Sequence, residues 1–222
     1  MSKLFLLRHL KSQWNEENRF AGWTDGPLAK DAGQKAKEIS EEISKFKVDK
    51  IYTSPLFRNM ETVAKIFELL PQKYPLFLHL DGGKMQKWGN FIDLSDNDIP
   101  TYVSEKLNER YYGKIQGLNK TETALQYGEE QVRLWRRDYN TAPPGGESLK
   151  DVYKRVVPFY KKYIEKDLQE GENVLVVASH NSLRVIIKYI ENIPDDEIIN
   201  LELPFAALIK YEFNKKTYSQ LP

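Results

Sequence analysis

Apolar residues along the chain fall into short continuous runs that alternate with longer stretches of helical spacing. The short runs are typical of buried strands and lie at 3–8, 50–53, 76–80, 173–178 and 207–213. Apolar positions recur every three or four residues over 30–46, 54–70, 148–166 and 181–191, which indicates helices. Strands that alternate with helices predict an α/β fold of three layers, in which helices cover both faces of a mostly parallel sheet.

Local signals mark the starts of two of these helices. Ser54-Pro55 places an N-cap residue before a proline at the first helical position. Asn181 and Ser182 come soon after the strand 173–178, and we expect them to cap the helix that follows.

The stretch at about 81–106 fits neither pattern, and we expect it to form a lid or loop inserted into one domain that spans residues 1–222. It is rich in turn-forming residues, namely Gly82, Gly83, Gly89, Asn90, Asp96, Asn97 and Pro100. A loop of this length in a compact domain is usually functional or disordered. Apolar side chains within it favour a lid over a linker, namely Met85, Trp88, Phe91, Ile92 and Tyr102.

Composition and charge narrow the range of functions. The chain has no cysteine, which excludes disulfides, thiolate metal sites and a cysteine nucleophile. The apolar run after Lys3 is too short for a signal peptide and no stretch is long enough to span a membrane, so we expect a cytoplasmic protein. The formal net charge is +1, and we therefore expect no nucleic acid or membrane partner. Affinity for an anion must come from a local cluster such as Arg133, Arg136 and Arg137.

Polar and basic side chains follow three of the predicted strands. These residues are Arg8-His9, Thr53-Ser54 with Arg58 one turn later, and Ser179-His180. Ligands of open α/β sheets bind outside the carboxyl ends of the strands, so we expect these side chains to converge. Two histidines and two arginines suit a phosphate, because guanidinium groups supply paired planar donors and an imidazole supplies a nucleophile.

The third histidine, His79, lies in an alternating Leu-Phe-Leu-His-Leu run, and we expect it to have a structural or surface role. Histidines and cysteines do not cluster in threes, so we expect no zinc site.

The segment from Leu4 to Asn15 resembles the signature of the histidine phosphatase superfamily, whose usual form is Arg-His-Gly-Glu-Ser. Further segments resemble cofactor-dependent phosphoglycerate mutases, in the same order and over nearly the whole chain: 107–113, 116–120, 135–137, 144–149 and 180–184. The Asn-Glu-Arg, Asn-Lys and Arg-Arg segments are the most specific, because they distinguish the mutases from general phosphatases.

The resemblance implies a phosphoglycerate mutase-like fold and the interconversion of 3- and 2-phosphoglycerate, a step of glycolysis and gluconeogenesis. It implies 2,3-bisphosphoglycerate as the primer, no metal, and a small phosphorylated carboxylate as the substrate. Members of the family often form dimers or tetramers, so a homo-oligomer is expected.

The same resemblance implies a role for each site residue. His9 is expected to attack a phosphoryl group and carry it as phosphohistidine, while Arg8, Arg58 and His180 stabilise the phosphoryl oxygens. Glu109 is expected to exchange a proton with the substrate hydroxyl, and a nearby phosphate would favour its protonated form. The expected substrate-binding residues are Ser12, Asn15, Ala21, Gly22, Arg110, Tyr111, Tyr112, Lys120, Arg136, Arg137 and Asn181.

The chain departs from the family pattern beside both histidines. Leu10 and Lys11 replace the glycine and the acid of the signature, and we expect them to crowd the loop and to add a cation. One glycine is missing after His180, so the backbone there must follow a different path. The usual Pro-Thr-Gly-Val-Pro segment is Pro204-Phe-Ala-Ala-Leu208, and Ala21 replaces a residue that bears a hydroxyl.

These departures leave three functions open. The first is the mutase, which the second cluster of cations favours because a phosphatase needs only one anion pocket. The second is a phosphomonoesterase of the same superfamily, in which the altered loops admit water to the phosphoenzyme. The third is a non-catalytic homologue that binds phosphate ligands, although binding alone does not require Glu109.

Overall fold

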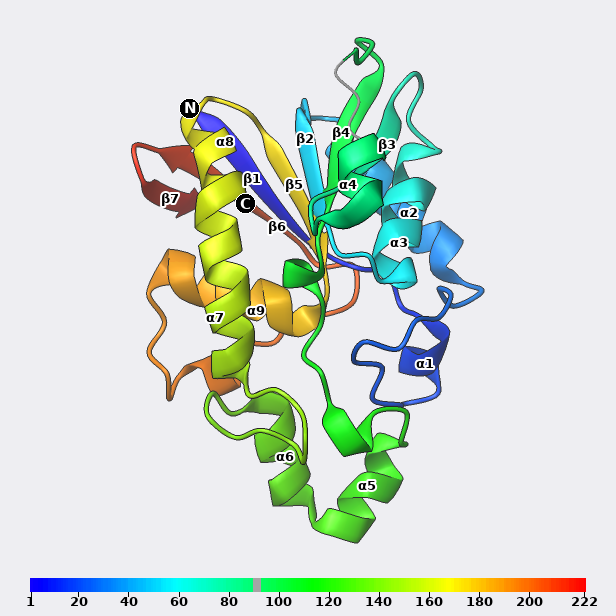
Figure 1. Cartoon of the computed structure of the whole chain (residues 1–222), viewed down its shortest axis with the longest axis vertical. Helices are drawn as coiled ribbons and strands as arrows, with labels where there is room; N and C mark the ends of the chain where they lie inside the picture. The colour runs from blue at the N-terminus through cyan, green and yellow to red at the C-terminus, as the bar shows by residue number, and fades with distance from the viewer. Residues whose placement is uncertain (90–92) are drawn as a thin grey trace.

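The computed structural model describes residues 1–89 and 93–222, and within them the strands form one sheet (Figure 1). The strands are β1 (Ser2–Arg8), β2 (Lys50–Thr53), β3 (Tyr74–His79), β4 (Asp98–Val103), β5 (Val174–Ala178), β6 (Leu208–Asn214) and β7 (Thr217–Gln220). Their order is β3-β4-β2-β5-β1-β6-β7. Neighbours from β3 to β1 pair in parallel, whereas β6 and β7 pair antiparallel at one edge.

Helices lie on both faces of this sheet and beyond one end of it (Figure 1). The α-helices are α1 (Gln13–Glu16), α2 (Ala32–Ile43), α3 (Phe57–Phe67), α4 (Gly83–Gly89), α5 (Lys120–Tyr127), α6 (Glu129–Arg137), α7 (Leu149–Phe159), α8 (Glu165–Gln169) and α9 (His180–Glu191). The π-helical segment η3 (Tyr160–Ile164) joins α7 to α8, and short 3-10 turns are η1 (Glu105–Leu107), η2 (Gly113–Ile115) and η4 (Ile198–Asn200).

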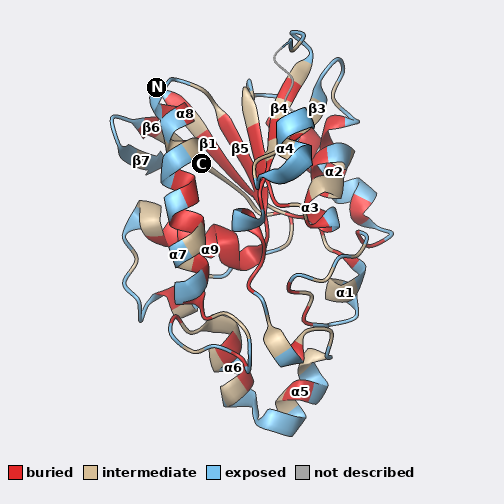
Figure 2. Cartoon of the chain, viewed as in Figure 1, coloured by how far each residue is buried: buried red, intermediate tan, exposed pale blue. Residues whose placement is uncertain are grey.

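Successive side chains of β1 point to opposite faces of the sheet, and this alternation explains the three layers. Leu4 and Leu6 belong to a buried cluster with side chains of α7 and α9, whereas Phe5 and Leu7 belong to a second cluster with α2 and α3. Figure 2 shows this buried interior as red strands between helices whose outer faces are exposed. The predicted mostly parallel α/β fold of three layers is confirmed.

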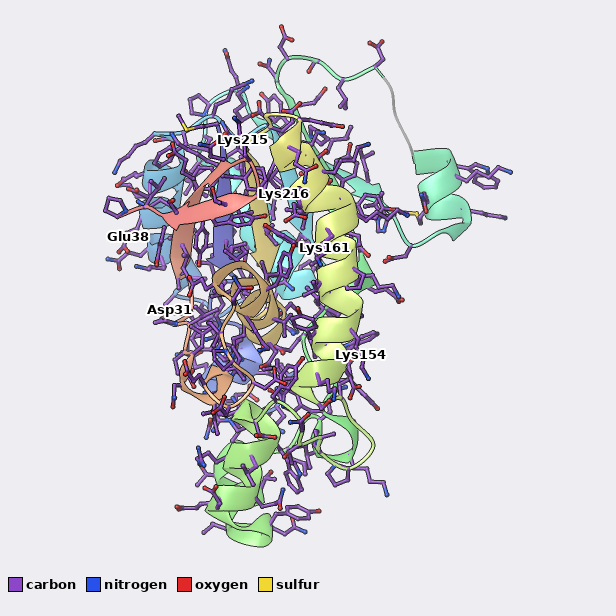
Figure 3. All side chains as sticks on the ribbon, turned by 90° about the vertical axis from the view of Figure 1, so that its left-hand side faces the viewer. Asp31, Glu38, Lys154, Lys161, Lys215 and Lys216 are labelled. Carbon is purple, nitrogen blue, oxygen red and sulfur yellow. The ribbon has the colours of Figure 1, made fainter. Side chains whose placement is uncertain are left out.

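Figure 3 shows the same layers from the side. The labelled Lys154 and Lys161 project from the long helix on one side, and Asp31 and Glu38 lie at α2 on the other. All four side chains are exposed, so charge of both signs is spread over the outer layers.

The prediction that residues 81–106 are irregular was wrong in part, because they contain α4 and the strand β4. β4 lies between β3 and β2 and buries Ile99, Thr101 and Val103 on alternate positions. Pro100 hid this strand, since proline is rare in the interior of a sheet. Asn90, Phe91 and Ile92, which we placed in the same loop, lie outside the described residues.

Two predicted helix starts were also wrong. α3 begins at Phe57 with Leu56 as its N-cap, and the Ser54 hydroxyl accepts a bond from the Leu56 N–H at 3.4 Å instead. α9 begins at His180 with Ser179 as its N-cap, so Asn181 and Ser182 lie inside the first turn.

A small helical unit made of α5 and α6 lies beyond the carboxyl ends of the strands, at the bottom of Figure 1. The Asn119 side chain caps α5 by accepting from Thr121 N and Glu122 N, and Gly128, at φ +89°, separates the two helices. A separate buried cluster of Phe20, Ile115, Val132 and Trp135 holds this unit in place. It therefore covers the sheet edge where the predicted site residues converge.

Among the described residues, no helix is long and apolar enough to cross a membrane.

Candidate active site

His9 directly follows β1 at the carboxyl edge of the sheet. Its backbone N–H donates to the Ala178 carbonyl at 3.2 Å, and its Nδ1 lies 2.6 Å from the carbonyl of Leu10. Because a carbonyl only accepts, the ring proton belongs on Nδ1 and the lone pair on Nε2. Burial, reinforced by the Arg58 and Arg8 guanidinium groups, holds the pKa of His9 well below its ordinary value. The ring is therefore neutral at neutral pH, with an unprotonated Nε2.

Arg8 and Arg58 line the same cavity as this imidazole and are themselves anchored. Arg58 Nη2 donates to the Gly22 carbonyl at 2.7 Å, while Arg8 donates to the Leu203 carbonyl and stacks 3.7 Å from the centre of the Phe205 ring. Burial lowers the pKa of Arg8 to about 10, so it stays charged at neutral pH. The buried Nε of each arginine has no acceptor among the described residues. An oxyanion in the cavity would supply that acceptor.

Glu109 is buried and held by neutral N–H donors. Its Oε1 accepts from Arg110 N at 2.6 Å and from Asn181 Nδ2 at 2.7 Å, and its Oε2 lies 3.4 Å from Asn181 N. Burial raises the pKa of Glu109, but His180 and these donors outweigh it and bring the pKa below its usual value. The carboxyl is therefore ionised at neutral pH in the ligand-free site, and a bound phosphate would favour its protonated form.

The second histidine, His180, is the first residue of α9 and faces a carboxylate that the sequence did not point to. Its Nε2 lies 3.3 Å from Glu202 Oε2, within ion-pair range but without the alignment of a hydrogen bond. Burial lowers the pKa of His180 to about 4, against the opposing effect of Glu202. A bound phosphate dianion would favour the protonated ring.

A second group of cations comes from the α5–α6 unit. Lys120 begins α5, and Arg136 and Arg137 end α6, so the unit turns three cationic side chains toward the cavity. Burial, together with Arg136, lowers the pKa of Lys120 to about 8. Tyr112 lines the cavity with these cations. Its hydroxyl keeps its proton at neutral pH, because burial raises its pKa.

These side chains line one cavity of about 290 Å³. The predicted residues that the structure places in it are Arg8, His9, Asn15, Ala21, Gly22, Arg58, Glu109, Tyr112, Lys120, Arg136, Arg137 and His180. The arginine cluster is only partly involved, because Arg133 points to solvent and pairs with Glu130 at 2.7 Å. His79 and the described part of 81–106 do not line the cavity, and the lid role of that stretch stays a prediction.

Four predicted binding residues do not line the cavity. The Ser12 hydroxyl donates to Asn15 Oδ1 at 2.8 Å, and Tyr111 donates its N–H to Glu147 at 2.8 Å with its side chain exposed. Arg110 is fully buried and donates to the Trp135 carbonyl of α6. Asn181 contacts Glu109 rather than the cavity.

Sequence reasoning missed a supporting residue and part of the lining. Arg184, fully buried on α9, donates at 3.0 Å to Asn181 Oδ1 and so orients the amide that holds Glu109. The lining residues that we did not predict are Asn18, Arg19, Phe20, Glu202 and Phe205. For Glu202 and Phe205, the only nearby signal in the sequence was the departure from the family pattern at Pro204–Leu208.

The departure after His9 does not affect the cavity in the expected way. Leu10 is completely buried in the cluster under α2 and α3, and its N–H donates to Thr62 Oγ1 at 3.1 Å. Lys11 pairs with Glu16 at 3.3 Å and does not line the cavity. Lys11 therefore adds its cation outside the cavity, and Leu10 fills the core, while crowding of the loop stays a prediction.

The donor set fits a small polyanion better than a metal ion. Arg8, Arg58, Lys120, Arg136 and Arg137 all line the cavity, and three of its side chains keep a buried nitrogen without a partner. No group of three or more His, Asp or Glu side chains is placed to hold a metal within residues 1–89 and 93–222. A ligand with two phosphates, or a phosphate and a carboxylate, matches this distribution of charge.

Comparison with known proteins agrees with this geometry. The family model for the histidine phosphatase superfamily (branch 1) matches residues 4–87 and 92–221. A 2,3-bisphosphoglycerate-dependent phosphoglycerate mutase of Methanococcus vannielii is 42% identical over 100% of this chain and 94% of its own length. The Chlamydia muridarum protein of the same name is 40% identical over 99% of this chain and 97% of its own.

A solved structure of a mycobacterial glucosyl-3-phosphoglycerate phosphatase with VO3 has the same fold. It has a TM-score of 0.77 at 21% identity and covers 99% of this chain and 97% of its own. The chain belongs to the histidine phosphatase superfamily, and within it to the family of 2,3-bisphosphoglycerate-dependent phosphoglycerate mutases.

Proposed function

We propose that the protein interconverts 3-phosphoglycerate and 2-phosphoglycerate through a phosphohistidine on His9, with 2,3-bisphosphoglycerate as its primer. The observation that carries the proposal is the presence of two cation groups in one cavity. One group surrounds His9, and the other is Lys120, Arg136 and Arg137. A phosphomonoesterase needs only the first group, whereas a mutase must also hold the far end of its substrate.

The bisphosphoglycerate, when bound, supplies the phosphoryl group that primes the enzyme. His9 Nε2 forms the new N–P bond as the O–P bond breaks, which requires the neutral tautomer set by the Leu10 carbonyl. Arg8 and Arg58 neutralise the charge on the phosphoryl oxygens, and His180 adds a donor when the negative charge of the bound phosphate favours its protonated ring.

Glu109 moves the proton. As a carboxylate it takes the proton from the substrate hydroxyl that attacks phospho-His9, so that the N–P bond breaks and a new O–P bond forms. As the protonated acid it then returns a proton to the oxygen that leaves during the next transfer to His9. Asn181 holds the carboxyl in both states, and Arg184 in turn holds Asn181.

The remaining residues bind the substrate or support those that do. Arg136, Arg137 and Lys120 bind the carboxylate and the distal phosphate, with Tyr112 and Asn15 adding hydrogen bonds at the wall. Arg110 and Ser12 act from behind it, through α6 and Asn15 respectively. Assembly into a dimer or tetramer remains a prediction of the family resemblance, and a cytoplasmic location remains a prediction of the short apolar runs in the sequence.

A labelling experiment tests the proposal. We expect radiolabelled 2,3-bisphosphoglycerate to leave an acid-labile label on the wild-type protein and on the His79→Gln control, but not on His9→Ala. We also expect isomerisation of 3-phosphoglycerate to depend on the primer. Phosphate release from many monoesters without isomerisation would favour the phosphomonoesterase, and no label with ligand binding retained would favour the non-catalytic homologue.

A further inference from the structure

Glu202 is an acidic side chain in a cavity otherwise rich in cations. One of its carboxylate oxygens pairs with Arg137 Nε, and the other lies 3.3 Å from His180 Nε2. Glu109 is the other acid that lines the cavity, but it is buried and bonded to neutral donors. The Glu202 side chain is 52% exposed, and these two partners are groups that the proposed mechanism assigns to the substrate.

The backbone around Glu202 is fixed, so its side chain is the part that is free to move. The Leu203 carbonyl accepts from Arg8, and Ala206 N donates to the His9 carbonyl at 3.3 Å. Phe205 stacks under Arg8. Displacing the segment would disturb the nucleophile, whereas rotating a half-exposed carboxylate toward solvent would not.

We propose that Glu202 is an internal counter-ion that occupies part of the anion site and is displaced when a polyanionic substrate binds. The proposal rests on the proposed function, because it assumes that Arg137 and His180 bind the substrate. Arg137 and His180 cannot give the same donors to Glu202 and to a ligand at once. The carboxylate therefore sets the affinity for phosphoglycerates without taking part in the chemistry.

Two consequences follow from electrostatics. Removing the charge at Glu202 should tighten binding of 3-phosphoglycerate by roughly five-fold, the effect of a favourable ion pair at a half-exposed position. This gain in affinity should shrink as salt is added. Screening weakens both the ion pair between Glu202 and Arg137 and the repulsion between Glu202 and the substrate anion. In steady-state kinetics, KM should fall while kcat stays the same or decreases through slower product release.

The test compares Glu202→Gln with Glu197→Gln. Both variants remove one negative charge from the segment after α9, but Glu197 is exposed and does not line the cavity. Calorimetric titration with 3-phosphoglycerate and with inorganic phosphate, at low and high salt, gives the affinities. Thermal unfolding checks that both variants are folded.

Tighter binding by Glu202→Gln alone, lost at high salt, supports the proposal. Equal affinities of wild type and Glu202→Gln, or an equal gain in Glu197→Gln, overturn it while leaving phosphohistidine labelling of the wild type intact. If the wild type binds neither ligand and takes no label, the proposed function fails and this proposal fails with it.

Discussion

At the scale of single residues, the fold sets the protonation states of His9 and Glu109 in opposite ways. His9 loses its proton from Nε2 through burial and its arginine neighbours, and Glu109 stays ionised because N–H donors surround it. The unprotonated Nε2 of His9 and the carboxylate of Glu109 therefore suit the roles of nucleophile and base that the proposed mechanism assigns to them.

The ionisation of His9 leads to a direct prediction. Nitrogen-15 NMR should show its ring as the neutral Nδ1–H tautomer from about pH 8 down to about pH 6, where a free imidazole is already mostly protonated. The chain has three histidines, and a His9→Gln spectrum assigns the signal. An imidazolium signal for His9 above about pH 6.5 would contradict the account.

Lys120 should make ligand binding depend on pH in the alkaline range. Its pKa is lowered to about 8, so its ammonium group is lost as the pH rises through that value. Between about pH 7 and about pH 9 the affinity for 3-phosphoglycerate should fall several-fold, and Lys120→Arg should remove most of this slope because arginine stays charged. The same slope in both proteins would show that another group is responsible.

At the scale of helices and loops, Arg155 of α7 holds the loop that carries Glu109. Its guanidinium donates to the carbonyls of Asn108 and Glu109, both at 2.8 Å, and pairs with both oxygens of Glu147. Glu147 follows the Pro-Pro-Gly-Gly turn, which packs so tightly on Gly113 that a Cβ there would lie 2.3 Å from the Pro144 carbonyl. The loop and the turn therefore form one rigid support.

Removing this support should affect both stability and turnover. Arg155→Ala leaves Glu147 and the loop carbonyls without their donor, and we expect the free energy of unfolding to fall by about 3 kcal/mol. Urea denaturation measures this loss, and kcat should fall as Glu109 shifts. Lys154→Ala, an exposed neighbour on the same helix, should change stability by less than about 0.5 kcal/mol. A similar small loss in Arg155→Ala would rule out the supporting role.

The sequence predicted elements well where the pattern was long and periodic. The long helix 148–166 and the strands that end at Arg8 and Ala178 were placed within a few residues, because both faces of the sheet and one face of the helix are apolar. β4 was missed because turn formers surround it and Pro100 interrupts it. The helices α5 and α6 were missed because their apolar side is a small cluster that includes Phe20, far away in the chain.

Across the molecule, a nearly neutral chain brings several of its cations together in one cavity. The outer layers carry both charges, while the carboxyl edge of the sheet gathers arginines from β1, α3 and α6. The sequence identified most of these cavity residues through the strand-end rule and the family motifs. It could not identify Glu202 or Arg184, because only the folded chain brings the former beside Arg137 and the latter beside Asn181.

Two substrates should distinguish the roles of the two cation groups, because only 3-phosphoglycerate carries a second anionic group. Arg136→Ala and Arg137→Ala should lower kcat/KM for 3-phosphoglycerate by roughly 100-fold, as expected for lost charge-assisted hydrogen bonds. Hydrolysis of a small aryl phosphate, which has no distal anion, should change by less than roughly three-fold. Arg133→Ala, on the same helix but facing solvent, should change neither. Equal losses on both substrates would contradict the distal anion pocket.

We expect the phosphoryl group to pass between two hydroxyls through His9 rather than to water. Phosphorus-31 NMR of 3-phosphoglycerate with a trace of 2,3-bisphosphoglycerate measures both fates in one sample. We expect 2-phosphoglycerate to rise to equilibrium with little inorganic phosphate, and His9→Ala to form neither. Inorganic phosphate appearing at the rate at which substrate is lost, without 2-phosphoglycerate, would contradict the account.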